Sequence, residues 1–182
     1  ILRINKKESQ EKLQLKIVVS SGSKLATLAG LLSHAGQGTG IVFCNLRDSI
    51  QKVSEYLTDN DIEHSCFYGG LEQVDRERAL IKFRNGTHKI LLATDLAARG
   101  IDVPEMDFIV HFEMPFKEDE FTHRNGRTAR MNTEGTAYIL KEKSQRLPAF
   151  IKGVPEEELR KGTGRSSSKW VTLYITGGRK DK

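Results

Sequence analysis

Short apolar runs alternate with amphipathic segments over most of this chain. Runs of about four to eight apolar residues between polar or turn residues are typical of strands buried in a parallel sheet. They predict six strands, at residues 13–21, 41–44, 62–68, 89–93, 106–112 and 135–140. The segments between them repeat apolar residues at helical spacing and predict helices at 23–34, 46–57, 72–84, 143–151 and from residue 117. Strands that alternate with helices form parallel βαβ units, so we expect an α/β fold with a mostly parallel sheet.

The two ends of the chain depart from this alternation. Residues 1–12 are polar without a period, and we expect them to be a linker before a domain at 13–152. Residues 153–168 are charged and rich in glycine and serine, which predicts a second linker. In 169–182 the alternating run WVTLYI predicts a strand. This strand would either open a further domain or dock alone on a sheet edge.

Positive charge is concentrated at the C-terminal end. The formal net charge is +5, and from Arg160 onward there are seven basic residues and one acid. Of the 29 basic and 24 acidic residues, 22 and 23 therefore lie in residues 1–159. The tail would supply a general attraction to nucleic acid, whereas a site on the nearly neutral domain has to be a local groove.

The cysteines and the lengths of the apolar runs bear on the location of the protein. Cys44 and Cys66 each lie in an apolar, strand-like run, which favours reduced, packed thiols over a disulfide or a metal site. No apolar run approaches the roughly 20 residues of a membrane span, and the first residues carry no signal-peptide pattern. We expect a cytoplasmic protein and no metal ligands in this chain.

Residue types suited to phosphate binding gather in two stretches, ATDLAARGID (93–102) and HRNGRTAR (123–130). The first places a hydroxyl, a carboxylate and a glycine just past the end of a strand, where open α/β sheets bind ligands. The second has an arginine at every third residue, and a helix would align these guanidinium groups on one side, ready for a polyphosphate. Each stretch also has an ordinary explanation, as a helix N-cap and as a solvated helix face.

Taken in order, these stretches resemble the motifs of a known family. ATDLAARGID resembles motif V and HRNGRTAR resembles motif VI of the DEAD-box RNA helicases. Upstream, IVFCN (41–45) resembles motif IV, and Gly69-Gly70 with Gln73 and Arg76 resembles motif IVa. The resemblance implies the C-terminal RecA-like domain of such a helicase, a three-layer sandwich with helices on both faces of the sheet. The run at 169–182 resembles the start of the RNA-binding tail domain of DbpA-like members, here truncated.

The resemblance implies roles for named residues toward ATP and the partner domain. Arg127 and Arg130 would meet the γ-phosphate, and Arg130 would be the arginine finger that stabilises charge on the transferred phosphoryl group. Asp102 would contact the ribose, and Gly100 would let the backbone approach it. In the same way, the resemblance has His123 and Arg124 connecting motif VI to the acidic motif of the partner domain.

On the RNA side, the resemblance implies contacts to phosphates and sugars from Asn45, Gly69, Arg76 and Thr94, with Gln73 positioning that surface. Backbone contacts position a strand without reading its bases, so RNA binding by this domain would be independent of sequence. Discrimination of RNA from DNA would come through the 2′-hydroxyl.

The activity implied for the full-length protein is that of an RNA-dependent ATPase that unwinds short duplexes. These 182 residues contain neither a GxxxxGK[ST] loop nor a DEAD tetrad. The Mg²⁺ ligands and the catalytic carboxylate are therefore expected on an N-terminal RecA-like domain. We expect this chain alone to hydrolyse no ATP.

Two other functions stay open, and motif VI departs from the family pattern at two residues. The chain could be a superfamily 2 DNA translocase domain, or a non-catalytic RNA-binding module that acts through its basic tail. Motif VI usually has an aliphatic residue where Asn125 stands and a glycine where Ala129 stands. Asn125 is therefore expected either to lose a core contact or to find a polar partner.

Overall fold

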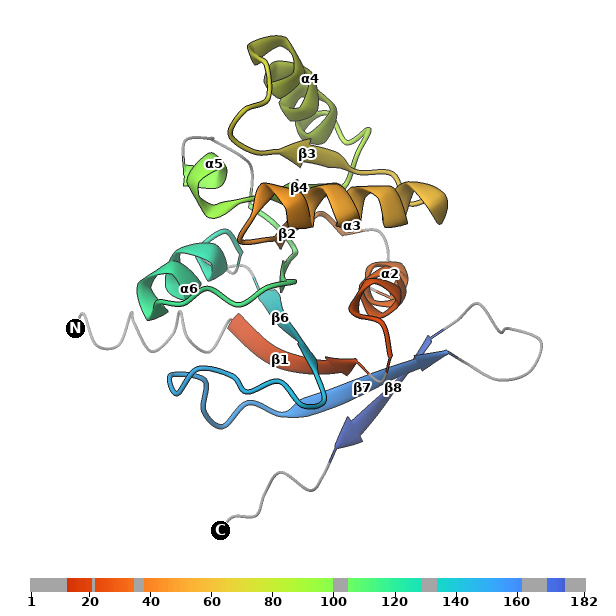
Figure 1. Cartoon of the computed structure of the whole chain (residues 1–182), viewed down its shortest axis with the longest axis vertical. Coiled ribbons are helices and arrows are strands. Elements are labelled where there is room, and N and C mark those ends of the chain that lie inside the picture. The colour runs from red at the N-terminus through yellow and green to blue at the C-terminus, as the bar shows by residue number, and fades with distance from the viewer. Residues whose placement is uncertain are drawn as a thin grey trace.

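One mostly parallel sheet runs through the molecule (Figure 1). The computed structural model describes residues 13–20, 22–34, 38–99, 105–128, 134–161 and 170–175. In this part of the chain eight strands pair in the order β3-β4-β2-β5-β6-β1-β7-β8. All neighbouring strands are parallel except β7 and β8, which are antiparallel. The strands are β1 (Leu13–Ser20), β2 (Gly40–Phe43), β3 (Ser65–Phe67), β4 (Ile90–Ala93), β5 (Phe108–His111), β6 (Gly135–Glu142), β7 (Glu156–Lys161) and β8 (Trp170–Ile175).

Helices cover both faces of this sheet, as the sequence predicted. They are α2 (Lys24–His34), α3 (Arg47–Asp59), α4 (Gln73–Arg84), α5 (Asp95–Arg99) and α6 (Glu118–Asn125). Successive side chains of a strand point to opposite faces, so each central strand serves two cores. Val42 of β2 packs in a cluster with residues of α2 and α3. Its neighbours Ile41 and Phe43 pack in a second cluster, with Phe83 of α4 and the alanines of α5.

A third cluster lies on the same face as α4 and α5, nearer to β1. Phe121 of α6 packs there with Ile17, Val19 and Ile139, which belong to β1 and β6. Strand β6 has β1 on one side and β5 on the other. Helix α6 is thereby held over β1 and β6, and Phe121 also stacks on His111 of β5, the strand that leads into this helix. Within the described residues, no helix is long and apolar enough to cross a membrane.

The predicted helix at 143–151 was wrong. This segment forms turns and irregular backbone between β6 and β7. Pro148 has no N–H to donate and disfavours helical backbone at the residue before it. Leu147 and Phe150 nevertheless pack against the core cluster that holds Phe121. Their apolar character had suggested a helix, but an irregular segment buries them equally well.

The predicted linker at 153–168 includes the whole of β7, which joins the sheet beside β1. Its charged sequence had hidden it, because backbone pairing needs no apolar residues and an edge region tolerates polar side chains. Glu157 is nonetheless buried, and its Oε2 lies 3.7 Å from Nζ of Lys16. Strand β8 pairs antiparallel with β7, so the alternating run at the C-terminal end does form a strand. Whether it opens a further domain stays a prediction.

Candidate functional site

The chemistry-bearing residues gather where β2, β3, β4 and β5 end. In a parallel sheet the carboxyl ends of the strands share one edge, and open α/β sheets bind ligands there. Asn45 follows β2, Gly69 follows β3, Thr94 follows β4 and Glu113 follows β5. Motifs far apart in the sequence therefore come together at one rim.

Arg124 of α6 is the buried centre of this rim. Its side chain is only 1% exposed. Nε and Nη2 donate to the two carboxylate oxygens of Asp95, each at 2.7 Å. Nη2 also donates to Oδ1 of Asn45, and Nη1 donates to the carbonyl of Glu113, again at 2.7 Å. With a further bond from Nη1 to Nδ1 of His111 at 3.3 Å, all five donors of the guanidinium are used.

His111 connects this network to Asn125, one of the residues that depart from the family pattern in motif VI. A guanidinium only donates, so Nδ1 of His111 accepts from Arg124 and the ring proton lies on Nε2. Nε2 then donates to Oδ1 of Asn125 at 2.8 Å. Burial, reinforced by the charge of Arg124, lowers the pKa of His111 to about 3. The polar partner expected for Asn125 is therefore a neutral, buried histidine.

Two predictions about the arginine segment need correction. Helix α6 ends at Asn125, so Arg127 lies beyond it and the guanidinium groups do not align along one helix face. Instead Arg124 turns inward to Asp95, and Nη2 of Arg127 donates to the carbonyl of Ala98 at 2.7 Å. Both arginines hold α5. The implied contact of Arg124 with a partner domain does not fit this structure, because no donor of Arg124 is left to make it.

His123 and Arg127 lie on the outer side of this network. His123 is exposed and Arg127 is half-buried. Both line a small hollow of about 20 Å³ together with Arg99 and Glu120. Gly100, Asp102 and Arg130, the other residues expected to face ATP, lie outside the described residues.

A larger groove of about 380 Å³ opens beside the network, over the ends of β2, β3 and β4. Three residues predicted to bind RNA line it, namely Asn45, Gly69 and Thr94. Gly69 is exposed, and a side chain there would meet no atom within 4 Å, so the backbone can be approached closely. The amide of Asn45 is already engaged, since Oδ1 accepts from Arg124 and Nδ2 donates to the carbonyl of Met114.

Gln73 and Arg76, the other predicted RNA-binding residues, lie on α4 and do not line this groove. Gln73 is exposed and donates to Oε2 of Glu77 at 3.2 Å. The guanidinium of Arg76 lies 4.9 Å from the ring centroid of Phe67, the last residue of β3. Arg76 is therefore held at the β3 end of the rim, next to the groove wall.

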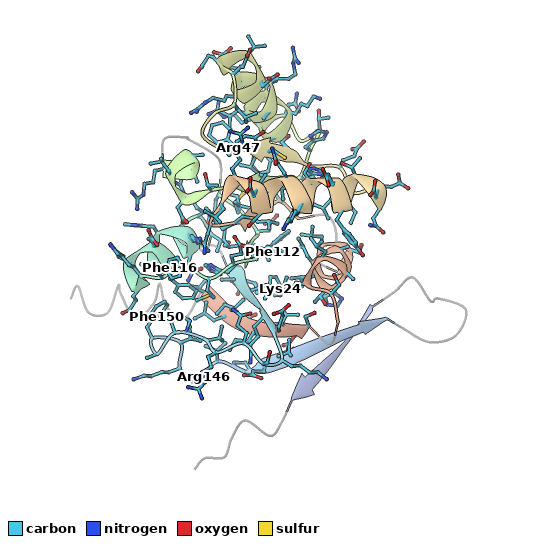
Figure 2. The ribbon with its side chains drawn as sticks, viewed as in Figure 1. Lys24, Arg47, Phe112, Phe116, Arg146 and Phe150 are labelled. Carbon is cyan, nitrogen blue, oxygen red and sulfur yellow. The ribbon has the colours of Figure 1, made fainter. Side chains whose placement is uncertain are left out.

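Sequence reasoning overlooked two arginines of the groove, Arg47 and Arg99. Arg47 begins α3, and its guanidinium lies 5.3 Å from the ring centroid of Tyr68 (Figure 2). Gly70 has a φ of +99°, and a side chain there would come within 3.0 Å of Nη1 of Arg47. The position of each arginine in the sequence could have pointed to the groove. Arg47 stands at the start of the helix after β2, and Arg99 stands at the end of the short helix after β4.

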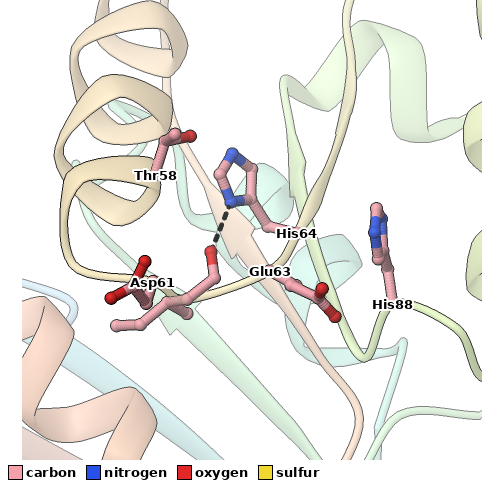
Figure 3. A pocket seen from close by; sticks show the side chains of 6 residues that line it. Thr58, Asp61, Glu63, His64 and His88 are labelled. Atoms are coloured by element: carbon pink, nitrogen blue, oxygen red, sulfur yellow. Dashed lines mark hydrogen bonds between the residues drawn. The ribbon is translucent and has the colours of Figure 1, made fainter.

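A separate hollow of about 390 Å³ lies at the opposite edge of the sheet, before β3 and β4 (Figure 3). Its residues include His64 and His88, but both ring nitrogens of His64 are bonded, to Oγ of Ser54 and to the carbonyl of Ile62. Among the residues that the structure describes, no group of three or more His, Cys, Asp or Glu side chains could hold a metal ion. We assign no chemistry to this hollow.

The sheet order, the two helical layers and the polar rim define a RecA-like α/β domain. Residues 23–132 match the family model described as "Helicase conserved C-terminal domain". The chain belongs to this family and is the C-terminal domain of a DEAD-box helicase.

Relatives and solved structures agree with this assignment. The chain is 34% identical over 172 residues to the ATP-dependent RNA helicase DbpA of Escherichia coli (strain K12), covering 90% of this chain and 37% of DbpA. It is 38% identical over 132 residues to DEAD-box ATP-dependent RNA helicase 9 of Oryza sativa subsp. japonica, covering 71% of this chain and 21% of that protein. The chain thus spans well under half of these relatives.

Among solved structures, the DEAD-box protein SrmB of E. coli, bound to the regulator of ribonuclease activity RraA, has a TM-score of 0.70 at 31% identity. That match covers 79% of this chain and 88% of the SrmB chain. Dbp5 of S. cerevisiae, bound to RNA and ADP BeF3, has a TM-score of 0.63 at 28% identity, covering 70% of this chain and 34% of Dbp5.

Proposed function

We propose that this chain is the C-terminal half of an ATP-dependent RNA helicase. It would close on an N-terminal RecA-like domain over ATP and single-stranded RNA and separate short duplexes. The observation that carries this proposal is the groove at the sheet rim, where Gly69, Thr94, Arg47 and Arg99 line an open surface. Relatives named as ATP-dependent RNA helicases support the same assignment.

Toward RNA, the groove offers exposed backbone, a hydroxyl and guanidinium groups. Gly69 and Thr94 would contact phosphates and sugars, and Arg76, held against Phe67, would add a charge at the α4 end. Asn45 would act by positioning, because its amide is occupied by Arg124 and Met114. Contacts of this kind are made to the sugar-phosphate backbone of the RNA and not to its bases, so binding would be independent of RNA sequence.

Toward ATP, the residues present supply half of a site. Arg127 and Arg130 would meet the γ-phosphate, while Gly100 and Asp102 would meet the ribose. Arg127 fits this role because its guanidinium is anchored to Ala98 yet remains half-buried beside a hollow. When bound, ATP with Mg²⁺ supplies the γ-phosphoryl group that is transferred to water, and the Mg²⁺ ligands would lie on the N-terminal domain. The protein would act in the cytoplasm.

RNA-stimulated ATP hydrolysis tests this proposal. This chain would be joined to the N-terminal domain of its own parent protein, and Arg127→Ala and Arg130→Ala would be compared with wild type. We expect each variant to lose at least about 10³-fold of the stimulated rate, because arginine fingers contribute on that order. Lys52→Ala on the exposed side of α3 is the matched control and should hydrolyse ATP at the wild-type rate.

The alternative of a non-catalytic RNA-binding module makes a different prediction. If it is right, neither arginine variant changes the hydrolysis rate, and removal of residues 153–182 abolishes RNA affinity. Stimulation by DNA as strong as that by RNA would instead indicate a DNA translocase. The isolated chain should hydrolyse no ATP in either case.

A further inference from the structure

A second cavity continues the groove along the same rim. It has a volume of about 510 Å³ and lies over the ends of β2, β5 and β6. Asn45 lines both the groove and this cavity, so the two hollows adjoin the same residue at the end of β2. A strand lying in the groove can therefore continue past Asn45 into the cavity without leaving the rim.

Besides Asn45, three segments far apart in the sequence line the cavity. Lys24 comes from α2, Phe116 from the connection between β5 and α6, and Arg146 from the irregular segment after β6 (Figure 2). Arg146 is exposed and has no hydrogen bond or ion pair with any residue that the structure describes. Lys24 lies deeper, where Nζ donates to the carbonyl of Phe112 and sits 4.8 Å from the centroid of its ring.

Phe116 is the unusual residue of this cavity. Its side chain is 87% exposed, more than that of any other exposed large hydrophobic residue in the described chain. The ring of Phe121, which lies just beyond this connection in α6, packs into the core instead. An aromatic ring left in water beside a basic residue is the arrangement by which proteins stack bases of a single strand.

The charge of the cavity favours a polyanion. Two cations, Lys24 and Arg146, line it together with one carboxylate, Glu113. The carboxylate is engaged, because Oε1 accepts from the backbone N–H of Asn45 and Oε2 accepts from Oγ of Ser49. Lys24 is already bonded to the carbonyl of Phe112, so Arg146 is the cation left to attract a phosphate, while Glu113 keeps the junction at Asn45 in shape.

We propose that this cavity is an additional single-stranded RNA subsite, in which Phe116 stacks a base and Arg146 contacts a phosphate. The subsite rests on the proposed function, since it extends the RNA path of the groove. It lengthens the bound strand on the side of β5 and β6. A bound apolar peptide fits the site less well, because peptide grooves present several apolar anchors and this cavity exposes a single large apolar ring.

RNA length separates the subsite from the groove. The parent protein, with a non-hydrolysable ATP analogue, would be titrated against labelled oligouridylates of about five and about twelve nucleotides, a short and a long member of the range of site sizes of single-strand binders. We expect Phe116→Ala to weaken binding of the longer RNA about fivefold or more, and to leave the shorter RNA unchanged. Phe116→Trp should retain the affinity, and Phe116→Leu, which keeps apolar area without the ring, should not.

One further readout and a control variant sharpen this test. Arg146→Ala should lower the slope of log affinity against log salt by about 0.7 for the longer RNA, as one lost phosphate contact predicts. Ile81→Ala, which removes another exposed apolar side chain, on α4, is the matched control and should change neither affinity.

Three outcomes would overturn the proposal. Equal loss of affinity for both lengths would mean that Phe116 supports the domain as a whole. Unchanged binding of both lengths in Phe116→Ala would remove RNA as the occupant of the cavity. Failure of the wild-type protein to bind either RNA would overturn the RNA function itself, and the subsite with it.

Discussion

Arg124 and Arg99 lie at the same rim and in the same hollow, but their surroundings differ. The side chain of Arg124 is 1% exposed, and its five donors all reach partners within the domain. Arg99 is exposed, and it forms no hydrogen bond or ion pair with the part of the chain that the structure describes. One arginine ties α6 to three strand ends, whereas the other faces solvent.

The difference separates the residues that build the site from those that meet a ligand. Removing a guanidinium from water is costly unless each donor finds an acceptor, and Arg124 meets this condition through Asp95, Asn45, Glu113 and His111. A saturated group of this kind has nothing left to offer a phosphate. An arginine with free donors at the surface can bind a phosphate with little rearrangement.

The largest expected effect on stability comes from removing the side chain of Arg124. Arg124→Ala should lower the free energy of unfolding by about 3–5 kcal/mol, because it leaves the carboxylate of Asp95 without its partner at the rim. Urea denaturation of this chain, followed by circular dichroism, measures it. Arg99→Ala is the matched control and should change stability by less than about 0.5 kcal/mol.

If Arg124→Ala does not fold, a milder change at the partner of Arg124 can still test the network. Asp95→Asn keeps the volume of the side chain, but it removes the charge and replaces one of the two acceptor oxygens with an NH₂ donor. One acceptor for Arg124 remains, so this variant should cost less than Arg124→Ala while still exceeding Arg99→Ala. Equal stability of the Arg124 and Arg99 variants would show that the buried network does not hold the domain together.

The same contrast explains how far the sequence could predict the structure. Apolar runs identified β2, β4 and β5, because strands buried on both faces have no polar side to obscure the pattern. The motifs also located the rim, since Asn45, Gly69 and Thr94 come together in one groove. Strand β7 was missed because its charged residues form a sheet by backbone pairing, which leaves no mark in hydropathy.

The inward turn of Arg124 could not be predicted from spacing. The i,i+3 pattern of arginines holds only while a helix continues, and α6 ends at Asn125. The direction of Arg124 depends on acceptors from three other segments, around Asn45, Asp95 and Glu113. Such long-range pairing is decided by the fold and not by the local sequence.

A smaller effect is expected from Asn125. Asn125→Ile restores the aliphatic residue usual in motif VI but removes the acceptor for Nε2–H of His111, which is fully buried. An unsatisfied buried donor costs about 1–3 kcal/mol, so we expect a loss of stability in that range. Adding His111→Leu should recover part of the loss, since both partners are then apolar. If the single variant is as stable as wild type, the bond between His111 and Asn125 adds nothing to the network.

The pH dependence of unfolding gives the most specific test of the network. The pKa of His111 falls to about 3 in the folded protein, because of burial and the nearby charge of Arg124, against 6.5 for an ordinary histidine. Below about pH 6.5 the unfolded chain therefore binds a proton that the folded chain refuses, so stability is lost as the pH falls. The expected slope is up to about 1.4 kcal/mol per pH unit until the folded pKa is reached.

His111→Gln removes this contribution, while His88, whose pKa is lowered by partial burial, contributes equally to both proteins and cancels in their difference. If the two proteins lose stability in parallel between pH 6.5 and 4, His111 takes up a proton in the folded state, and the donor from Arg124 to its Nδ1 is not formed.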